Sequence, residues 1–549
     1  MKNKFLKRII AITCVSTMLL ASMTGCVAKK KVVKKGGSGG DVLKIMILAK
    51  GYGSDWLTAL AEAFEKKHDV QVDISLVTSE EVIKGDIKNT EVCDTDLYFT
   101  IYTMGGHGLM AETERVYENG QALRDLTDVY NTEIPGEGIT IADKMNASLR
   151  EAYMVDGRDS EDTSDDTYYF MPYVSSAMGL YYNETVIDNA LGKGKWSVPN
   201  TTDELIALCE RLDKKGCSIM LPGSLDQWTS SVWMSWWAQY EGLENYQKFY
   251  QGIGYNKSAD REEENSEKIF AQPGRLAATE VSHRLLNNAN GYSLKNSIEI
   301  TVNNLNEYQT RFTLAKNNYA IYPCGDWLMQ ELKNNSTIES DSVIKMMKTP
   351  VISSIVSSTD SYSADDAKRL PNITSDEILS QVVDYVDGTG ELPAGVTEEE
   401  VAVVKEARNI VGGKFMEHFV YAPVFSDAKE LADQFLLFMA SAEGIQIFKD
   451  NCAGGFSPFK YEYKDLTTTE ESVYEATKEA IYVTEFKHHE LFFRGGVRAV
   501  TAGTSDTLDG MLCKPKGMTA AEINNAMIEA YSGQKWEGYL SKLSYLQSE

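Results

Sequence analysis

"KIMILAKGYGSDWLTALAEAFEKKHDVQVDIS" (Lys44–Ser75) combines three patterns that together predict the fold class. Residues 42–48 are apolar except for one lysine, which predicts a short buried strand. In residues 56–67 the apolar side chains recur at helical spacing, which predicts an amphipathic helix. Residues 70–75 alternate apolar and polar side chains, as a half-buried strand does. A strand, a helix and a strand at this spacing predict a parallel crossover unit and therefore an α/β fold.

The loops that follow the predicted strands carry the first candidate ligand-binding residues. A third strand is predicted at residues 96–100, directly before Tyr102. Tyr52 and Asp55 lie in the loop Ala49–Asp55, which follows the first strand. Ligands of open parallel sheets bind beyond the carboxyl ends of the strands. We therefore expect these three side chains at one edge of a ligand cleft.

Composition limits the class of protein. The 549 residues are 43% hydrophobic, which is enough for more than one core, so two lobes are expected. The formal net charge is −26, and this argues against nucleic-acid binding, which needs a positive surface. The eight cysteines contain no CxxC pair. We expect those outside the leader to be mostly buried free thiols, with no metal site and no cofactor.

The first 41 residues have the pattern of an export signal with an anchor. Basic residues precede an apolar stretch, Ile9–Leu20, which is too short to span a bilayer as a mature helix. Met23–Cys26 resembles a bacterial lipobox, which implies removal of residues 1–25 and acylation of Cys26. Lysines and a Gly/Ser run follow in residues 26–41 and predict a flexible tether on the extracellular face of the membrane. The alternative is an ordinary secreted protein in which Cys26 has no such role.

Five blocks of sequence resemble one known family, in the same order. The opening block is the one quoted above. The second block, Met171–Leu205, contains a Tyr-Asn pair and the Pro-x-Thr-x-x-Glu-Leu element Pro199–Leu205. The other three blocks are "FTLAKNNYAIYPCGDW" (Phe312–Trp327), Ala422–Pro458 and Met518–Leu540. They are similar to the extracellular solute-binding proteins of ABC importers, in the sugar-binding family related to maltose-binding protein.

This resemblance implies a two-lobed periplasmic-binding-protein-like fold of type II. Each lobe would be a sheet flanked by helices, with the ligand cleft between the lobes. The first lobe would contain residues 42–172 and about 347–455, including an insertion at about 352–412. The second would contain residues 173–346 and about 456–549. The implied function is capture of a carbohydrate, an oligosaccharide in our expectation, by lobe closure, followed by delivery to a permease by a monomeric, membrane-anchored protein.

Aromatic and polar residues supply the candidate sugar-binding groups, because sugars present apolar ring faces as well as hydroxyls. Trp327 follows a predicted strand and a tight turn that contains Asp326, and the resemblance points to Trp327 as a stacking residue. Trp228 is expected in a polar loop before a helix whose other aromatic residues, at helical spacing, are core. Ser175 and Ser176 lie on the segment that crosses between the lobes. For each of these residues, packing within the protein is the alternative.

Other functions remain open at this point. A surface glycan-degrading enzyme needs two carboxylates at a fixed separation, and carboxylates are abundant here. However, the sequence has no GxSxG, HExxH or P-loop motif. A binding protein for a non-sugar solute, or one that reports to a sensor kinase, would have the same overall pattern.

Overall fold

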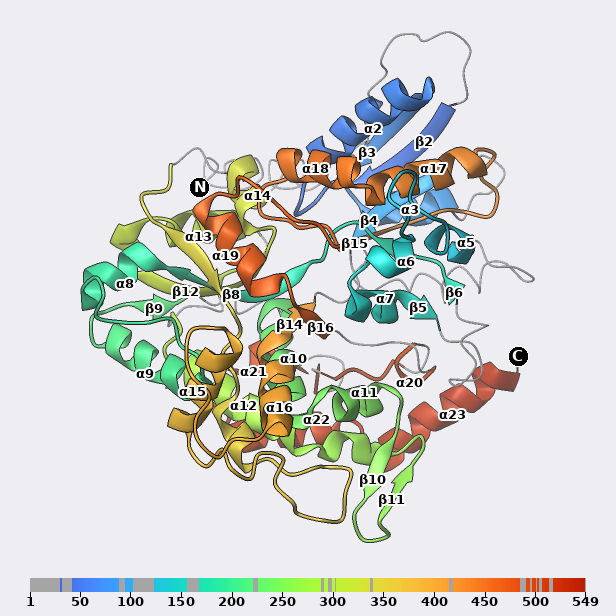
Figure 1. Cartoon of the computed structure of the whole chain (residues 1–549). Coiled ribbons are helices and arrows are strands. Elements are labelled where there is room, and N and C mark those ends of the chain that lie inside the picture. The colour runs from blue at the N-terminus through green and yellow to red at the C-terminus, as the bar shows by residue number, and fades with distance from the viewer. Residues whose placement is uncertain are drawn as a thin grey trace, which may run out of the picture.

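The computed structural model places two lobes side by side, joined by several crossings of the chain (Figure 1). It describes residues 30–31, 42–87, 94–101, 123–155, 167–220, 226–287, 291–294, 299–301, 303–335, 339–413, 418–483, 490–493, 496–499, 501–502, 506–512 and 517–548. The expected export signal, the expected acylation site Cys26 and the candidate Tyr102 lie outside these residues. None of the helices in the described ranges has the length and apolarity needed to span a membrane.

The first lobe is built on a six-stranded sheet. Its order is β1 (Lys30–Lys31), β3 (Gln71–Val77), β2 (Val42–Leu48), β4 (Leu97–Ile101), β15 (His418–Tyr421) and β7 (Met171–Pro172). β2 pairs in parallel with both β3 and β4, which confirms the predicted crossover unit. β15 returns from far along the chain and pairs antiparallel with β4. The edge strand β1 pairs antiparallel with β3 and lies within residues 26–41, whose role as anchor and tether stays a prediction.

Helix α2 (Asp55–His68) covers this sheet as its apolar spacing predicts. Trp56, Leu57, Leu60, Ala61 and Phe64 are all buried. Burial of each large apolar side chain contributes about 1.5–3 kcal/mol. The helix begins with an acidic residue and ends with basic ones, as the helix dipole favours. It therefore fixes the loop before it, which contains Tyr52, against the sheet.

The second lobe has its own six-stranded sheet. Along the main path the order is β16 (Ile481–Val483), β14 (Ile410–Gly413), β8 (Ala177–Asn183), β12 (Tyr319–Gly325) and β9 (Ser218–Ile219), and β13 (Ile344–Met347) also pairs with β8. β8 is antiparallel to β12, β13 and β14. The chain passes from the first sheet to the second between β7 and β8, where Ser175 and Ser176 lie.

The aromatic helix of the second lobe forms a core, as expected from its spacing. In α10 (Asp226–Glu241), Trp233, Trp236 and Trp237 are at most 1% exposed. Its neighbour α12 (Pro273–Leu286) contributes Arg275, whose buried guanidinium lies 4.8 Å from the ring centroid of Trp237. The four cysteines described as free, Cys209, Cys217, Cys324 and Cys452, are buried, which confirms the expectation for these positions.

The insertion does not decorate the first lobe, contrary to the expected boundaries. It contains α15 (Asp376–Val386) and α16 (Glu398–Asn409), and it leads into β14 of the second sheet. Arg408 at the end of α16 pairs with Asp387 and donates to the Thr349 carbonyl. Asn200 of the second lobe donates to Asp384 at 2.7 Å. Buried apolar residues and these polar contacts therefore fix the segment to the second lobe.

The remaining elements complete the two lobes. On the first-lobe side they are α3 (Glu80–Ile87), α5 (Thr127–Tyr130), α6 (Ile141–Lys144), α7 (Ala147–Tyr153), β5 (Met154–Val155), β6 (Thr167–Tyr168), α17 (Lys429–Ala440) and α18 (Ala442–Asn451). On the second-lobe side they are α8 (Glu184–Leu191), α9 (Thr202–Asp213), α11 (Leu243–Tyr250), β10 (Gly254–Asn256), β11 (Arg261–Glu263), η2 (Glu267–Ala271), α13 (Leu305–Phe312), η4 (Ala315–Asn317), α14 (Leu328–Asn335), η5 (Ser353–Ser357), α19 (Thr468–Thr477), α20 (Glu490–Phe493), β17 (Thr501–Ala502), β18 (Asp506–Thr507), α21 (Leu508–Leu512), α22 (Ala520–Glu529) and α23 (Gln534–Ser548).

Candidate functional site

Tyr52 and Asp326 join the two lobes through a buried hydrogen bond. Tyr52 lies in the loop after β2 of the first lobe, and Asp326 directly follows β12 of the second. The phenol hydroxyl of Tyr52 donates to Oδ1 of Asp326, and both side chains are at most 1% exposed. Two residues that the sequence places at the ends of different strands are thus brought together where the lobes meet.

Trp327 packs beside this bond in a cluster of rings from both lobes. Its centroid lies 6.0 Å from the Tyr52 ring, with the planes at 85°. His418, the first residue of β15, lies 6.0 Å from Trp327 and 4.8 Å from Tyr52. Such edge-to-face contacts are favourable for aromatic rings. Trp327 is only 2% exposed, so separation of the lobes would be needed to expose its face.

Gly51 lies in a turn of the first lobe beside the His418 and Trp327 side chains. Its φ is +63°, which favours glycine. A Cβ at this position would meet His418 Nε2 at 3.6 Å and the Trp327 side chain at 3.8 Å. These are ordinary contact distances, so glycine is favoured here by the backbone conformation of the turn rather than by lack of space.

Ser176 completes the cluster from the crossing segment. Its hydroxyl lies 2.8 Å from Nδ1 of His418. Its φ of +54° is unusual for a residue with a side chain, and such strain costs on the order of 1 kcal/mol. Backbone strain of this kind often occurs at functional sites. We call Tyr52, Ser176, Asp326, Trp327 and His418 the cleft cluster.

Asp326 is the chemically unusual member of the cleft cluster. Burial raises the pKa of its carboxyl to about 7, although hydrogen bonding from Tyr52 and from the Ala177 backbone opposes this rise. Its Oδ2 has no hydrogen-bond partner among the residues that the structure describes. Burial and the neighbouring Asp326 also raise the pKa of Tyr52 well above its usual value. A buried acid with a free acceptor atom can accept a hydrogen bond from a ligand hydroxyl once the cleft opens.

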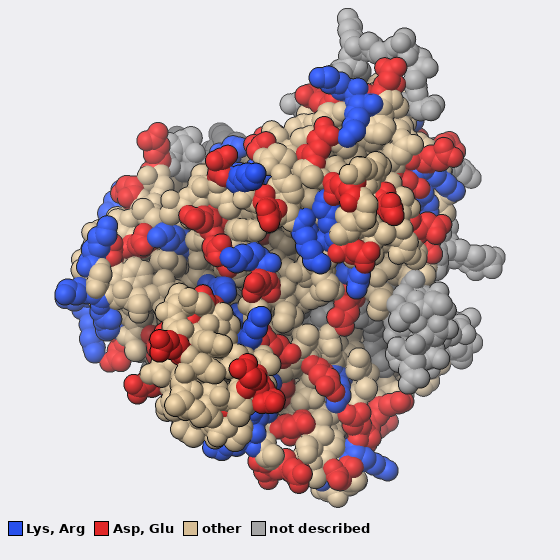
Figure 2. Space-filling model, in the orientation of Figure 1, with Lys and Arg blue, Asp and Glu red and all other residues tan. Residues whose placement is uncertain are grey.

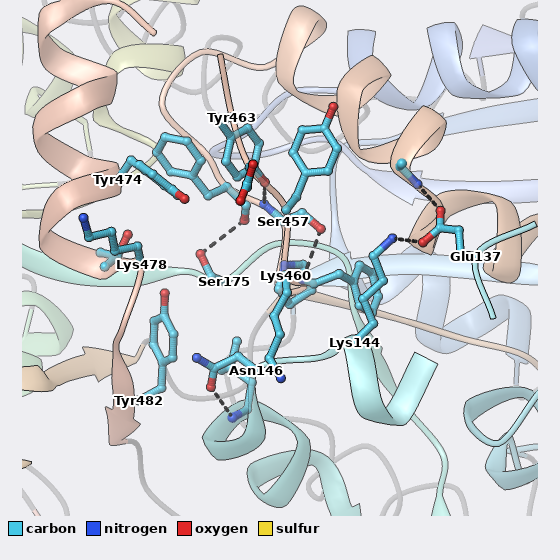
Figure 3. Close-up of a pocket in the computed structure, with 18 residues that line it drawn as sticks. Glu137, Lys144, Asn146, Ser175, Ser457, Lys460, Tyr463, Tyr474, Lys478 and Tyr482 are labelled. Carbon is cyan, nitrogen blue, oxygen red and sulfur yellow. Dashed lines mark hydrogen bonds and ion pairs between the residues drawn. The ribbon is translucent and has the colours of Figure 1, made fainter. Parts of the chain in front are cut away.

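Ser175, next to Ser176, faces a different space. Its hydroxyl donates to the Phe456 carbonyl at 3.2 Å, and its side chain lines a cavity of about 500 Å³ (Figure 3). This cavity, which we call the hinge pocket, is bounded by both lobes and by residues 456–463, which pass from one lobe to the other. It is lined by Glu137, Lys144, Asn146, Leu149, Ser175, Ala442, Phe456, Ser457, Pro458, Phe459, Lys460, Tyr461, Glu462, Tyr463, Tyr474, Thr477, Lys478 and Tyr482.

The other sequence candidates are placed as follows. Asp55 is exposed and is the first residue of α2. Trp228 does not precede α10, because that helix begins at Asp226; the expected loop position is therefore wrong, and the Trp228 side chain is not among those described. His418 was missed, since a single histidine near two glycines carries no recognisable pattern. Its role depends on the pairing of β15 with β4, which brings it to the cleft.

Charged side chains of both signs are interspersed over the visible face of the molecule (Figure 2). Acidic residues outnumber basic ones in the chain as a whole, 80 to 54. The cleft cluster itself contains one carboxyl group and several neutral hydrogen-bonding groups and rings. The arrangement therefore offers polar neutral contacts and ring faces rather than a strongly charged site.

The chain has the fold of two-lobed solute-binding proteins. Residues 50–292 match the model of the bacterial extracellular solute-binding protein family. This match confirms the resemblance found in the sequence blocks, and it is a family of binding proteins rather than of enzymes. No curated protein matches the chain.

Solved structures show the same two-lobed α/β fold at low sequence identity. RafE of Streptococcus pneumoniae is 14% identical, with a TM-score of 0.52, over 91% of this chain and 100% of that one. A probable secreted solute-binding lipoprotein of Streptomyces coelicolor is 13% identical, with a TM-score of 0.53, over 90% and 99%. A protein from a study of xylan utilization by Caldanaerobius polysaccharolyticus is 14% identical, with a TM-score of 0.51, over 90% and 100%. These likenesses confirm the fold class.

Proposed function

We propose that this protein captures a carbohydrate between its lobes and delivers it to the permease of an ABC importer, while an acylated Cys26 anchors it to the outer face of the cytoplasmic membrane. The observation that carries the proposal is the cleft cluster. Tyr52 and His418 of the first lobe contact Asp326 and Trp327 of the second, so these groups can surround a guest only when both lobes take part.

Lobe closure follows from this geometry. In the arrangement described here the Tyr52, Trp327 and His418 rings contact one another. Opening the lobes would separate Tyr52 from Trp327 and expose their faces. A ligand that contacts both sides binds the closed form better than the open one, and it shifts the equilibrium by that difference in affinity.

The chemistry of the cluster supports a sugar as the ligand. Ring faces suit the apolar faces of a pyranose, while the hydroxyls of Tyr52 and Ser176 and the carboxyl of Asp326 suit its hydroxyls. Asp55, Tyr102, Ser175 and Trp228 remain proposed ligand contacts from the sequence. The relative described in the xylan study supports an oligosaccharide, and the secreted lipoprotein relative supports the anchor at Cys26.

Titration calorimetry with mono- and oligosaccharides tests the proposal. Trp327→Ala is expected to weaken any detected binding at least about tenfold, because the stacking face is lost. Trp196→Ala is the matched control, since Trp196 packs against Tyr182 in the body of the second lobe and should leave binding unchanged. Equal affinities of the parent and the Trp327→Ala protein would contradict the site.

Product analysis separates binding from catalysis. The purified protein, incubated with an oligosaccharide that it binds, is expected to show a rise in melting temperature without cleavage products. Release of shorter sugars would instead support the glycan-degrading alternative, provided that substitution of a carboxyl group in the cleft abolishes this release.

A further inference from the structure

The hinge pocket lies on the other side of the crossing segment from the cleft cluster. Ser176 turns toward His418, whereas Ser175 turns toward Phe456 and the pocket. Ser175 and Tyr482, which line the pocket, also interact with Asp326, so the two spaces are neighbours, but no residue of the cleft cluster lines the pocket itself. The volume of about 500 Å³ is within the range of small-molecule sites.

The lower walls of the hinge pocket are held by hydrogen bonds between the lobes. The Asn146 side chain, at the start of α7, donates to the Ala480 carbonyl at 2.9 Å. The Tyr482 backbone N–H of β16 donates to the Ser148 hydroxyl at 2.7 Å. The Lys460 N–H also donates to the Lys144 carbonyl at 2.8 Å. The pocket is therefore a formed cavity, and little of it must be ordered when a ligand enters.

Charges around the hinge pocket are largely neutralised within the protein. The buried Lys144 pairs with Glu137 at 2.6 Å and donates to the Ala440 carbonyl at 2.8 Å. Lys478 pairs with Glu475 at 2.7 Å. The exposed Lys460 and Glu462 carry opposite signs. A neutral ligand fits this balance better than an ion, which would leave its own charge uncompensated after desolvation.

Hydroxyl groups and tyrosine rings dominate the rest of the lining. Figure 3 shows the hydroxyl ends of Tyr474 and Tyr482 and the Ser175 hydroxyl directed toward the same part of the cavity. Tyr461, Tyr463 and Tyr474 are half-buried. The Tyr463 ring packs edge to face, 5.0 Å from Tyr461 at 75° and 5.5 Å from Tyr474 at 72°. Convergent hydroxyls beside aromatic rings are the groups that a polyhydroxylated ring requires.

We propose that the hinge pocket is a second ligand site, which binds a neutral mono- or disaccharide independently of the cleft cluster. Its walls come from both lobes, so an occupant contacts both and favours the lobe arrangement in which the pocket has this shape. The site goes beyond the proposed transport function, because binding there would modulate lobe closure without the sugar being cargo.

The test uses the full mature chain with glucose, galactose, xylose, maltose and lactose as probes, observed by ligand-detected NMR and calorimetry. In the Trp327→Ala protein, which lacks the cleft stacking face, at least one probe is expected to bind with a dissociation constant of about 1 mM or tighter. Adding Tyr474→Ala to that protein should weaken this binding about tenfold or more. Tyr474→Phe keeps the packing against Phe456 and Tyr463 and should weaken it less.

Failure of this proposal differs from failure of the transport function. If no probe binds the Trp327→Ala protein, or if Tyr474→Ala leaves its binding unchanged while the melting temperature stays near that of the parent, the second site is overturned. The Tyr474→Ala protein with an intact Trp327 should keep its cargo binding whatever happens at the hinge pocket. Loss of cargo binding in that protein, at an unchanged melting temperature, would overturn the independence of the two sites.

Discussion

The hydroxyl of Tyr52 donates a hydrogen bond to the carboxyl of Asp326 across the interface between the lobes. Because this bond spans the interface, opening of the lobes would break it, and we expect opening to hydrate the Asp326 carboxyl. This relationship makes lobe closure sensitive to the protonation of one residue.

Ligand affinity should fall as the pH rises from about 4 to about 7. In the open form Asp326 is hydrated, with a pKa near its usual value of about 3.9. In the closed form burial raises that pKa to about 7, so closure takes up a proton between these values. Affinity should change by up to about tenfold per pH unit in this window and level off above it. Calorimetry across the window measures the slope.

Asp326→Asn supplies the control for this pH dependence. The amide cannot titrate, so ligand affinity should become nearly independent of pH between about 4 and 7. Tyr52, Tyr181, Tyr482 and Cys452 also interact with Asp326, but burial raises the pKa of each above its usual value and keeps all four neutral in this range. An unchanged slope in the Asp326→Asn protein would contradict the assignment of the pH dependence to Asp326.

The folded insertion should depend on Arg408, which pairs with Asp387 of the same segment and donates to the Thr349 carbonyl just before it. Burial raises the pKa of Asp387, but the charges and hydrogen bonds of Arg408 and Lys348 outweigh this and hold it below its usual value. Because Arg408 is 5% exposed, Arg408→Ala should cost about 3 kcal/mol of unfolding free energy. Arg284→Ala, which breaks the exposed pair with Asp203, should cost less than about 1 kcal/mol. Denaturant unfolding compares the two.

Asp69→Gly should stabilise the first lobe. Asp69 ends α2 with a φ of 54°, and its N–H donates to the Glu65 carbonyl. Glycine adopts this left-handed conformation without the side-chain penalty, so a gain of about 0.5–1 kcal/mol is expected. Asp69→Ala keeps the penalty and serves as the control. A melting temperature that is equal or lower for the glycine variant would contradict this prediction.

Cys26→Ser should release the protein from the membrane. Cleavage before Cys26 and acylation of that residue predict that the parent protein incorporates a labelled fatty acid in cells. The labelled protein should then partition into the detergent phase of an extract. The serine variant should lose the label and appear in the soluble fraction. A membrane-bound serine variant would contradict the anchor.

Local patterns predicted the parts of this fold that depend on neighbours in the sequence. The apolar spacing of residues 56–67 and of the tryptophans in α10 correctly indicated buried helix faces. The lobe of the 352–412 segment was predicted wrongly, because β14 has only four residues and its partner β8 lies far away in the sequence. Trp228 was misplaced since no local signal marks the start of α10. His418 reaches the cleft only through long-range pairing, which periodicity cannot reveal.

The pairing of β4 with β15 means that the first sheet can be completed only late in biosynthesis of the chain. Strand β4 ends at Ile101, but its partner β15 begins at His418, which is 418 − 101 = 317 residues later. Until the ribosome has made that later part, one side of β4 cannot acquire its native neighbour, and distant pairings of this kind form slowly. Under the proposed export, the first sheet would therefore stay incomplete until late in synthesis of the chain.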